Sequence, residues 1–218
     1  MDKQLTMDAQ LKETRSKKVP AIVGVLLLAI GVWFFWSTFK SKTHEEKLAQ
    51  IIHLEDSRKA SKDLLNYLGD DAPEIRARAA LAVGRIGAPK TGESLYQLLR
   101  DPSLDVASSA AFALGLTTDH SYARKLLETA NDLPATVAAW AVRSGGRLAD
   151  STMTDIGNEI AGYLLHPAPE VREAACYALF YARAKEAAGQ LVSFVKTEPD
   201  TAVKAAGLFV LARLGLDV

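Results

Sequence analysis

Residues 74–87 read EIRARAALAVGRIG, and residues 105–115 read DVASSAAFALG. The second stretch repeats the first 31 positions later, with apolar, small and glycine residues in the same places. The aligned pairs are Ile75 with Val106, Ala79 with Ala110, Ala82 with Ala113 and Gly84 with Gly115. A pattern that returns at a fixed spacing of roughly 20 to 50 residues is typical of proteins built from stacked structural repeats.

Three further segments carry the same pattern along the rest of the chain. They read TVAAWAVRSGGRL from residue 136, EVREAACYALFYA from residue 170 and AVKAAGLFVLARLG from residue 202. The first apolar residues of the five copies lie 31, 31, 34 and 32 positions apart, at Ile75, Val106, Val137, Val171 and Val203. Five copies in phase indicate one structural unit that is repeated.

Each copy is preceded by another apolar segment with helical spacing. Its apolar residues recur every three or four positions and therefore share one helix face, as in Leu64, Leu65 and Leu68, or Leu95, Leu98 and Leu99. Proline and acidic residues separate the two helices of each unit, at 71–73, 101–103, 132–134, 167–169 and 198–200. A single helix pair cannot bury its own apolar face, so we expect an all-α, right-handed α-solenoid of about five stacked pairs.

The repeat pattern of a proline or acid followed by V-R-x-x-A-x-x-A-L-G resembles HEAT-like repeats of the short bacterial type, also known from PBS lyases. Two copies match its opening, Glu74-Ile75-Arg76 and Glu170-Val171-Arg172, and the resemblance covers about residues 55–216. It implies a fold and no particular activity. The layout is also similar to bacterial membrane-anchored proteins in which such repeats precede a cyclophilin-type prolyl isomerase domain. No cyclophilin motif is present in this sequence, so that activity does not carry over.

Residues 21–39 read AIVGVLLLAIGVWFFWSTF, without a formal charge. As a helix this stretch is roughly 28 Å long, close to the thickness of a bilayer's hydrocarbon core. Aromatic residues gather toward its C-terminal end, where rings favour the headgroup boundary, and no small-residue cleavage site follows it. We therefore expect an uncleaved signal anchor that spans the membrane once.

Charge around this stretch predicts its orientation. The preceding tail carries five basic residues, Lys3, Lys12, Arg15, Lys17 and Lys18, and a basic excess favours the cytoplasmic side. The expected order is a short cytoplasmic tail over 1–20, a transmembrane helix over 21–39, a juxtamembrane helical segment over 40–54 and a HEAT-like repeat domain over 55–218. In a bacterium the anchor would lie in the inner membrane, with the repeats in the periplasm.

Composition and motifs point away from nucleic-acid binding and catalysis. Lys+Arg and Asp+Glu both total 26, whereas a nucleic-acid binder needs a basic surface. The four histidines lack the i, i+4 spacing of a metal pair. The one cysteine, Cys176, aligns with the packing positions Ala80, Ala111, Val142 and Leu208, so we interpret it as a small hydrophobe. We expect no enzyme activity, cofactor or nucleic-acid partner.

A helical wheel of the second helices suggests one surface for binding. Residues near Leu81 and Gly84 are expected to point away from the buried face, toward the inner curve of a solenoid. Across the copies this stripe runs through Leu81, Phe112, Arg143, Tyr177, Phe180 and Phe209. Such residues are plausible anchors for a peptide or helix from a protein partner. The alternative is that they pack laterally between neighbouring second helices.

The last helix, over 202–216, is strongly apolar, whereas solenoids normally finish with a polar cap. Either a partner or a second copy covers it, or the natural protein continues beyond Val218. The predicted function is a membrane-anchored scaffold for protein–protein interaction. The alternatives are the non-catalytic repeat portion of a larger enzyme of the prolyl isomerase type, or a HEAT-repeat protein that handles bilin chromophores.

Overall fold

The computed structural model describes residues 42–215 of the chain, and every regular element in that range is a helix. The predicted all-α class is therefore confirmed for these residues. The predicted cytoplasmic tail over 1–20 and transmembrane helix over 21–39 lie outside the described residues. Among the helices of 42–215, none combines the length and the apolar character needed to cross a bilayer.

The first helices of the repeats are short, and three of them end in a 3-10 turn. Side chains at three- and four-residue spacing still reach one face through such a turn, which is why the sequence indicates each as a single helix. They are α3 (Lys62–Asn66) with η1 (Tyr67–Gly69), α5 (Gly92–Gln97) with η2 (Leu98–Arg100), α7 (Tyr122–Ala130), α9 (Ile156–Gly162) with η3 (Tyr163–Leu165), and η4 (Lys185–Ala187) with α11 (Ala188–Thr197).

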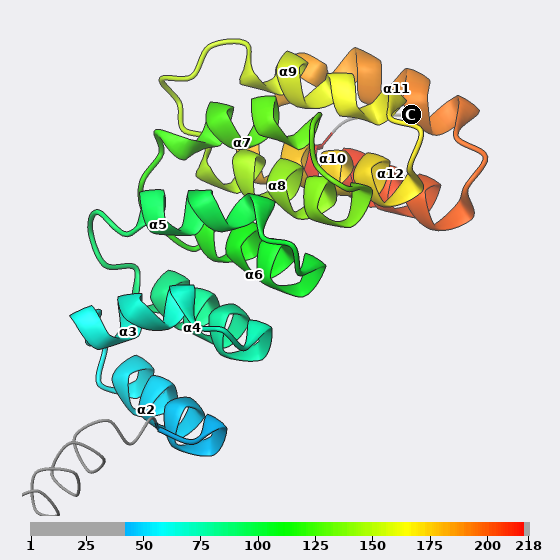
Figure 1. The fold of residues 1–218 in the computed structure, drawn as a ribbon. Coiled ribbons are helices and arrows are strands. Elements are labelled where there is room, and N and C mark those ends of the chain that lie inside the picture. Colours follow the sequence, from blue (N-terminus) through cyan, green and yellow to red (C-terminus); the bar gives the residue numbers. More distant parts are fainter. Residues whose placement is uncertain (1–41, 216–218) are drawn as a thin grey trace, which may run out of the picture. The chain divides into compact units, whose positions relative to one another are not determined.

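The second helices are longer and contain the copies of the repeated sequence. They are α4 (Pro73–Ile86), α6 (Leu104–Leu114), α8 (Ala135–Leu148), α10 (Pro169–Ala182) and α12 (Thr201–Leu214). Pro73 and Pro169 stand in the first turn of their helices, where a missing backbone N–H costs no hydrogen bond. Each second helix packs on the next in chain order, while the first helices form a parallel layer beside them (Figure 1).

Helix α2 (His44–Asp56) extends the layer of second helices by one, because it packs against α4 (Figure 1). Ile51 is fully buried there and Leu54 is nearly so. Glu55 at its end accepts hydrogen bonds from Arg78 and Arg85 of α4. The helix that the sequence indicates over 40–54 thus contributes to the same apolar core as the repeats, and the compact unit begins at His44.

Glycines allow successive second helices to approach closely. A Cβ on Gly84 would lie 2.7 Å from the Cα of Ala113, and a Cβ on Gly146 would lie 2.5 Å from the Cα of Ala178. Gly115 is equally close to α8, but its nearest neighbour is the side chain of Ser144. Gly84 is therefore buried in the contact between α4 and α6. The expectation that it points toward an open inner curve is wrong, because a residue without a side chain is needed where two helix backbones meet.

The arginines near the start of α4 and α10 connect neighbouring repeats. Arg76 donates two hydrogen bonds of 2.8 Å to the carboxylate of Asp101, and Arg172 does the same with Glu198. Each also donates through Nη1 to two backbone carbonyls of the turn that precedes its own helix. A planar guanidinium suits this task because its donors reach two partners at once.

Candidate functional site

A band of aromatic and arginine side chains runs across the second helices from α6 to α12. We call it the aromatic strip and define it as Phe112, Trp140, Arg143, Arg147, Tyr177, Phe180, Tyr181, Phe209 and Arg213. The strip exists because neighbouring second helices lie side by side, so that equivalent positions of successive repeats come into contact.

Ring contacts join the strip from one helix to the next. The rings of Phe112 and Trp140 meet edge to face at 5.3 Å between α6 and α8. Between α10 and α12, Phe209 lies 6.4 Å from Tyr177 and 6.2 Å from Phe180. These separations are within the range of favourable aromatic pairs. The rings therefore pack laterally, as the alternative interpretation of the sequence expected, yet Phe209 remains 48% exposed.

Arg143 occupies the middle of the strip. Its guanidinium carbon lies 4.4 Å from the ring centre of Tyr177, 5.8 Å from that of Trp140 and 6.0 Å from that of Tyr181. Arg147, one turn further along α8, lies 5.8 Å from the ring of Tyr181. A cation over an aromatic face is attracted by the ring quadrupole, more strongly where water is partly excluded.

Two small cavities flank Arg143. The first has a volume of about 170 Å³ and is lined by aromatic rings and two arginines, namely Phe112, Trp140, Arg143, Ser144, Arg147 and Tyr181. The second, of about 190 Å³, adds two carboxylates to its lining, which consists of Thr136, Ala139, Trp140, Arg143, Glu170, Glu173, Ala174 and Tyr177. Both are smaller than typical small-molecule sites of about 300–1,000 Å³, so a single side chain of a partner fits them better than a cofactor.

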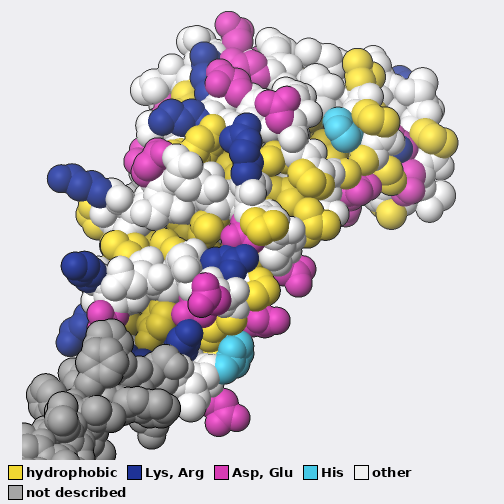
Figure 2. Space-filling model, in the orientation of Figure 1, with side chains coloured by type: hydrophobic (Ala, Val, Ile, Leu, Met, Phe, Trp, Pro, Cys, Tyr) yellow, Lys and Arg dark blue, Asp and Glu magenta, His cyan; other side chains and the backbone are white. Residues whose placement is uncertain are grey.

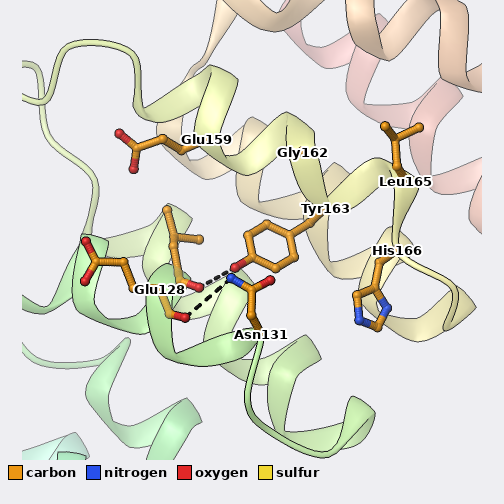
Figure 3. Close-up of a pocket in the computed structure, with 8 residues that line it drawn as sticks. Glu128, Asn131, Glu159, Gly162, Tyr163, Leu165 and His166 are labelled. Atoms are coloured by element: carbon orange, nitrogen blue, oxygen red, sulfur yellow. Dashed lines mark hydrogen bonds between the residues drawn. The ribbon is translucent and has the colours of Figure 1, made fainter.

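A larger cavity of about 460 Å³ lies on the first-helix layer, between α7 and the α9–η3 segment. Figure 3 shows the Tyr163 ring at its centre, with the carboxylates of Glu128 and Glu159 on one side and the His166 imidazole on the other. The Tyr163 hydroxyl donates to the carbonyl of Leu127 (Figure 3). Its pKa is raised because the ring is buried, so the hydroxyl stays protonated and structural.

The same layer carries an apolar cavity of about 480 Å³ between the α9–η3 segment and α11. Leu165, which is 86% exposed, lines both of these larger cavities. In the face shown in Figure 2, hydrophobic side chains lie among Lys/Arg and Asp/Glu side chains of both signs. That face therefore carries no extended area of one charge.

Comparison with known proteins bears on the repeats directly. Residues 41–115 and 61–146 match the family model for HEAT repeats. This stretch consists of HEAT repeats. No curated protein matches the chain significantly. The resemblance that the sequence suggested over about residues 55–216 is confirmed for the part that lies within 41–146. The first match begins just before α2, the helix that packs onto the first full pair.

Five of the six residues predicted for binding come together on the second helices of the repeats. Phe112, Arg143, Tyr177, Phe180 and Phe209 all belong to the aromatic strip. Leu81, on α4, is half-buried, and it lines neither of the cavities beside Arg143. The strip as the structure defines it therefore starts at α6, one repeat later than expected.

Sequence reasoning missed four members of the strip, Trp140, Arg147, Tyr181 and Arg213. All four lie three or four positions from a predicted residue: Arg147, Tyr181 and Arg213 follow Arg143, Tyr177 and Phe209 by four, and Trp140 precedes Arg143 by three. Residues at these spacings share a helix face. The helical periodicity therefore contained the signal, but, Phe180 apart, the comparison between copies followed a single position in each repeat.

Titratable groups elsewhere serve packing and connection between neighbouring repeats. Cys176 is fully buried in α10, and burial raises the pKa of its thiol to about 12, far from the value of a reactive cysteine. The hydrogen bond from Arg172 lowers the pKa of Glu198 despite the burial of that carboxylate. Within residues 42–215, histidine, cysteine and carboxylate side chains form no cluster that could hold a metal ion.

Proposed function

We propose that this chain is a membrane-anchored scaffold, a right-handed α-solenoid of HEAT repeats that binds a protein or peptide along its aromatic strip. The observation that carries the proposal is the strip itself, in which aromatic rings and arginines from four successive second helices are in contact and still partly exposed. Tyr, Trp and Arg are the residues that most often dominate the binding energy of protein interfaces.

The dimensions of the strip favour a peptide segment over a small molecule. Its two cavities, of about 170 and 190 Å³, lie on either side of Arg143 and share Trp140. Two adjacent side-chain-sized hollows match successive side chains of an extended or helical segment. We therefore prefer a binding scaffold to the alternative in which these repeats are the non-catalytic portion of a larger prolyl isomerase-like enzyme.

A bilin-handling protein is the second candidate, and the cavities of about 460 and 480 Å³ on the first-helix layer have the volume of small-molecule sites. Adding a bilin to the purified chain and recording its absorbance spectrum tests this candidate. A red-shifted, saturable spectrum would favour it over the scaffold, and an unchanged spectrum would count against it.

The anchor places the scaffold at a membrane. Residues 21–39 supply an uncharged stretch of the length that a bilayer requires, and the basic residues before it favour a periplasmic location for the repeats. A tethered repeat domain meets membrane partners at a raised effective concentration. Self-association through α12 is compatible with this arrangement, because Leu208 and Phe209 remain 41% and 48% exposed there.

Proximity crosslinking from native membranes tests the scaffold, with the full chain as bait. The informative variant is the double substitution Arg143→Ala with Tyr177→Ala. The matched control is Leu165→Ser, which removes an exposed apolar side chain from the first-helix layer. We expect wild type and control to capture the same protein, and the double variant to lose it at an unchanged melting temperature.

Two results would contradict the proposal. Equal capture by all three proteins would show that the strip does not bind the partner. Recovery of the bait alone would indicate self-assembly, and the strip would then serve lateral packing only. Parallel loss of capture and of thermal stability in the double variant would equally assign Arg143 and Tyr177 to packing.

A further inference from the structure

The half-buried arginines of residues 42–215 differ in what they contact. Arg76, Arg78 and Arg172 each have a carboxylate partner, in Asp101, Glu55 and Glu198 respectively. Arg143 is also half-buried, but within the described residues its contacts are aromatic rings and no carboxylate is bonded to it. Glu170 and Glu173 line a cavity with Arg143, but neither forms an ion pair with it. A partly desolvated guanidinium without a bonded carboxylate is costly, unless another molecule supplies one.

The way in which Arg143 is held leaves its donors available. A guanidinium that stacks on a ring uses its flat face, so the N–H groups at its edge remain free to bind a planar anion. Arg147 stands four residues away on the same face of α8, and both side chains line the cavity of about 170 Å³. Within the described part of the chain, Arg147 likewise contacts a ring and no carboxylate is bonded to it.

We infer that this cavity, between α6, α8 and α10, is a carboxylate site that receives an acidic side chain of the peptide bound along the strip. The inference rests on the proposed function and adds the chemistry of the partner: an Asp or Glu next to apolar residues. The two guanidinium groups bind the carboxylate, and Phe112, Trp140 and Tyr181 enclose the apolar part of the side chain. Charge-assisted hydrogen bonds of this kind are the strong ones at interfaces.

The neighbouring cavity sets a second condition on the peptide. Its lining includes Glu170 and Glu173 together with Arg143, so an anion there would meet two like charges. A peptide with its acid in the first cavity and a neutral or basic residue in the second has the complementary arrangement. The chain's balanced charge, with 26 basic and 26 acidic residues, supports a peptide over a nucleic acid as the source of the anion.

A display library of random twelve-residue peptides, panned against the purified full chain, tests this inference. Four proteins are compared: wild type, Arg143→Gln with Arg147→Gln, Arg143→Glu with Arg147→Glu, and the control Lys125→Gln. Lys125 is a matched control because it lies 4.8 Å from the ring of Tyr122 on α7, away from the strip. Tyr177→Ala, which alters the strip outside this cavity, serves as a fifth protein.

We expect wild type and the Lys125 variant to enrich acidic peptides. The double glutamine variant should bind them roughly 10- to 100-fold more weakly, as the loss of charge-assisted hydrogen bonds implies. The double glutamate variant should enrich basic peptides in their place. Circular dichroism melting curves establish that each variant is folded.

Three outcomes would overturn the inference. In the first, the enriched peptides show no acidic preference, fail to bind Tyr177→Ala and still bind the double glutamine variant. The strip would then remain a peptide site, but the cavity would not be a carboxylate site. Peptides whose binding ignores every strip variant would reject the proposed function as well. The third outcome comes from competition between a twelve-residue oligothymidylate and a polyglutamate of equal length. If the oligothymidylate displaces the acidic peptides at the lower concentration, the cavity is a phosphate site.

Discussion

At the scale of single residues, burial decides which groups are reactive. Cys176 is the only cysteine of the chain, is fully buried, and has a thiol pKa raised to about 12. At pH 8 we expect iodoacetamide to alkylate it at least roughly a thousandfold more slowly than free cysteine, because both access and thiolate are reduced. Mass spectrometry of the intact chain measures this. Rapid alkylation without denaturant, or none in 8 M urea, would contradict the structure.

The pair of Arg172 and Glu198 gives stability a dependence on pH. Because the hydrogen bond from Arg172 lowers the pKa of Glu198 in the folded state, the pair stabilises the fold above the carboxylate's unfolded pKa of about 4.3. That stability is lost as the pH falls through the lower folded value. Arg172→Met should cost about 3 kcal/mol at pH 7, since it leaves a buried carboxylate unpaired, and should flatten the decline in stability between about pH 5 and pH 3.

Urea unfolding at a series of pH values measures both effects. The control is the double variant Arg172→Met with Glu198→Met, in which no charge is left unpaired, so part of the lost free energy should return. A single variant with the wild-type pH profile would show that other carboxylates govern acid unfolding.

At the scale of helices, substitution by alanine should have opposite effects at a glycine between second helices and at a glycine with open space around it. Alanine is the better helix former by about 1 kcal/mol, yet a Cβ on Gly146 would lie 2.5 Å from the Ala178 backbone. Gly146→Ala should therefore lower the free energy of unfolding by about 1–3 kcal/mol through overpacking. Gly189→Ala in α11, where no atom lies within 4 Å of the new Cβ, should be neutral or stabilising. Thermal unfolding of both variants separates the two effects.

Much of the helical order could be predicted from the sequence, because turn residues such as Pro73 and Pro169 mark where second helices begin. The 3-10 ends of the first helices could not, since apolar spacing is nearly the same in both helix types. The burial of Gly84 could not be predicted from one helix alone. Whether a glycine faces solvent or a neighbouring backbone depends on how close the next helix lies.

For the aromatic strip, the sequence predicts equivalent positions but not the contacts between them. A repeat alignment finds Phe112, Arg143 and Tyr177 at equivalent places, but contacts such as that between Arg143 and Trp140 depend on the rotation of each helix about its axis. Leu81 illustrates the same limit: it occupies the equivalent position on α4, yet it lines neither of the cavities beside Arg143.

At the scale of the whole molecule, the central prediction is that the full chain is a membrane protein. After cell fractionation, we expect it to remain in membranes washed with alkaline carbonate, and Leu27→Arg with Leu28→Arg to move it to the soluble fraction. Charged residues in the middle of a spanning helix cost about 2.5–3.5 kcal/mol each. Release of the wild-type chain by carbonate would contradict the anchor. Because the two substitutions leave the repeats unaltered, folding of the repeat domain serves as the control for the variant.

Orientation is tested separately with spheroplasts. Protease added from outside should digest the repeat domain if it lies in the periplasm, and a cytoplasmic marker protein should survive the same treatment. Protection of the repeats until the membrane is lysed would reverse the proposed orientation.

The position occupied by Gly84, Gly115 and Gly146 is taken in the next repeat by Phe180, which lies nine residues after the first apolar residue of its copy, as they do. At Gly84 and Gly146 the next backbone is in direct contact, at Gly115 the small side chain of Ser144 comes first, and in the last contact the ring of Phe180 meets that of Phe209 between α10 and α12. One residue per repeat thus acts as a spacer of adjustable thickness. Exchanging it offers protein engineers, and natural selection, a way to alter the curvature of the stack one step at a time, while the exposed side chains that meet a partner stay the same.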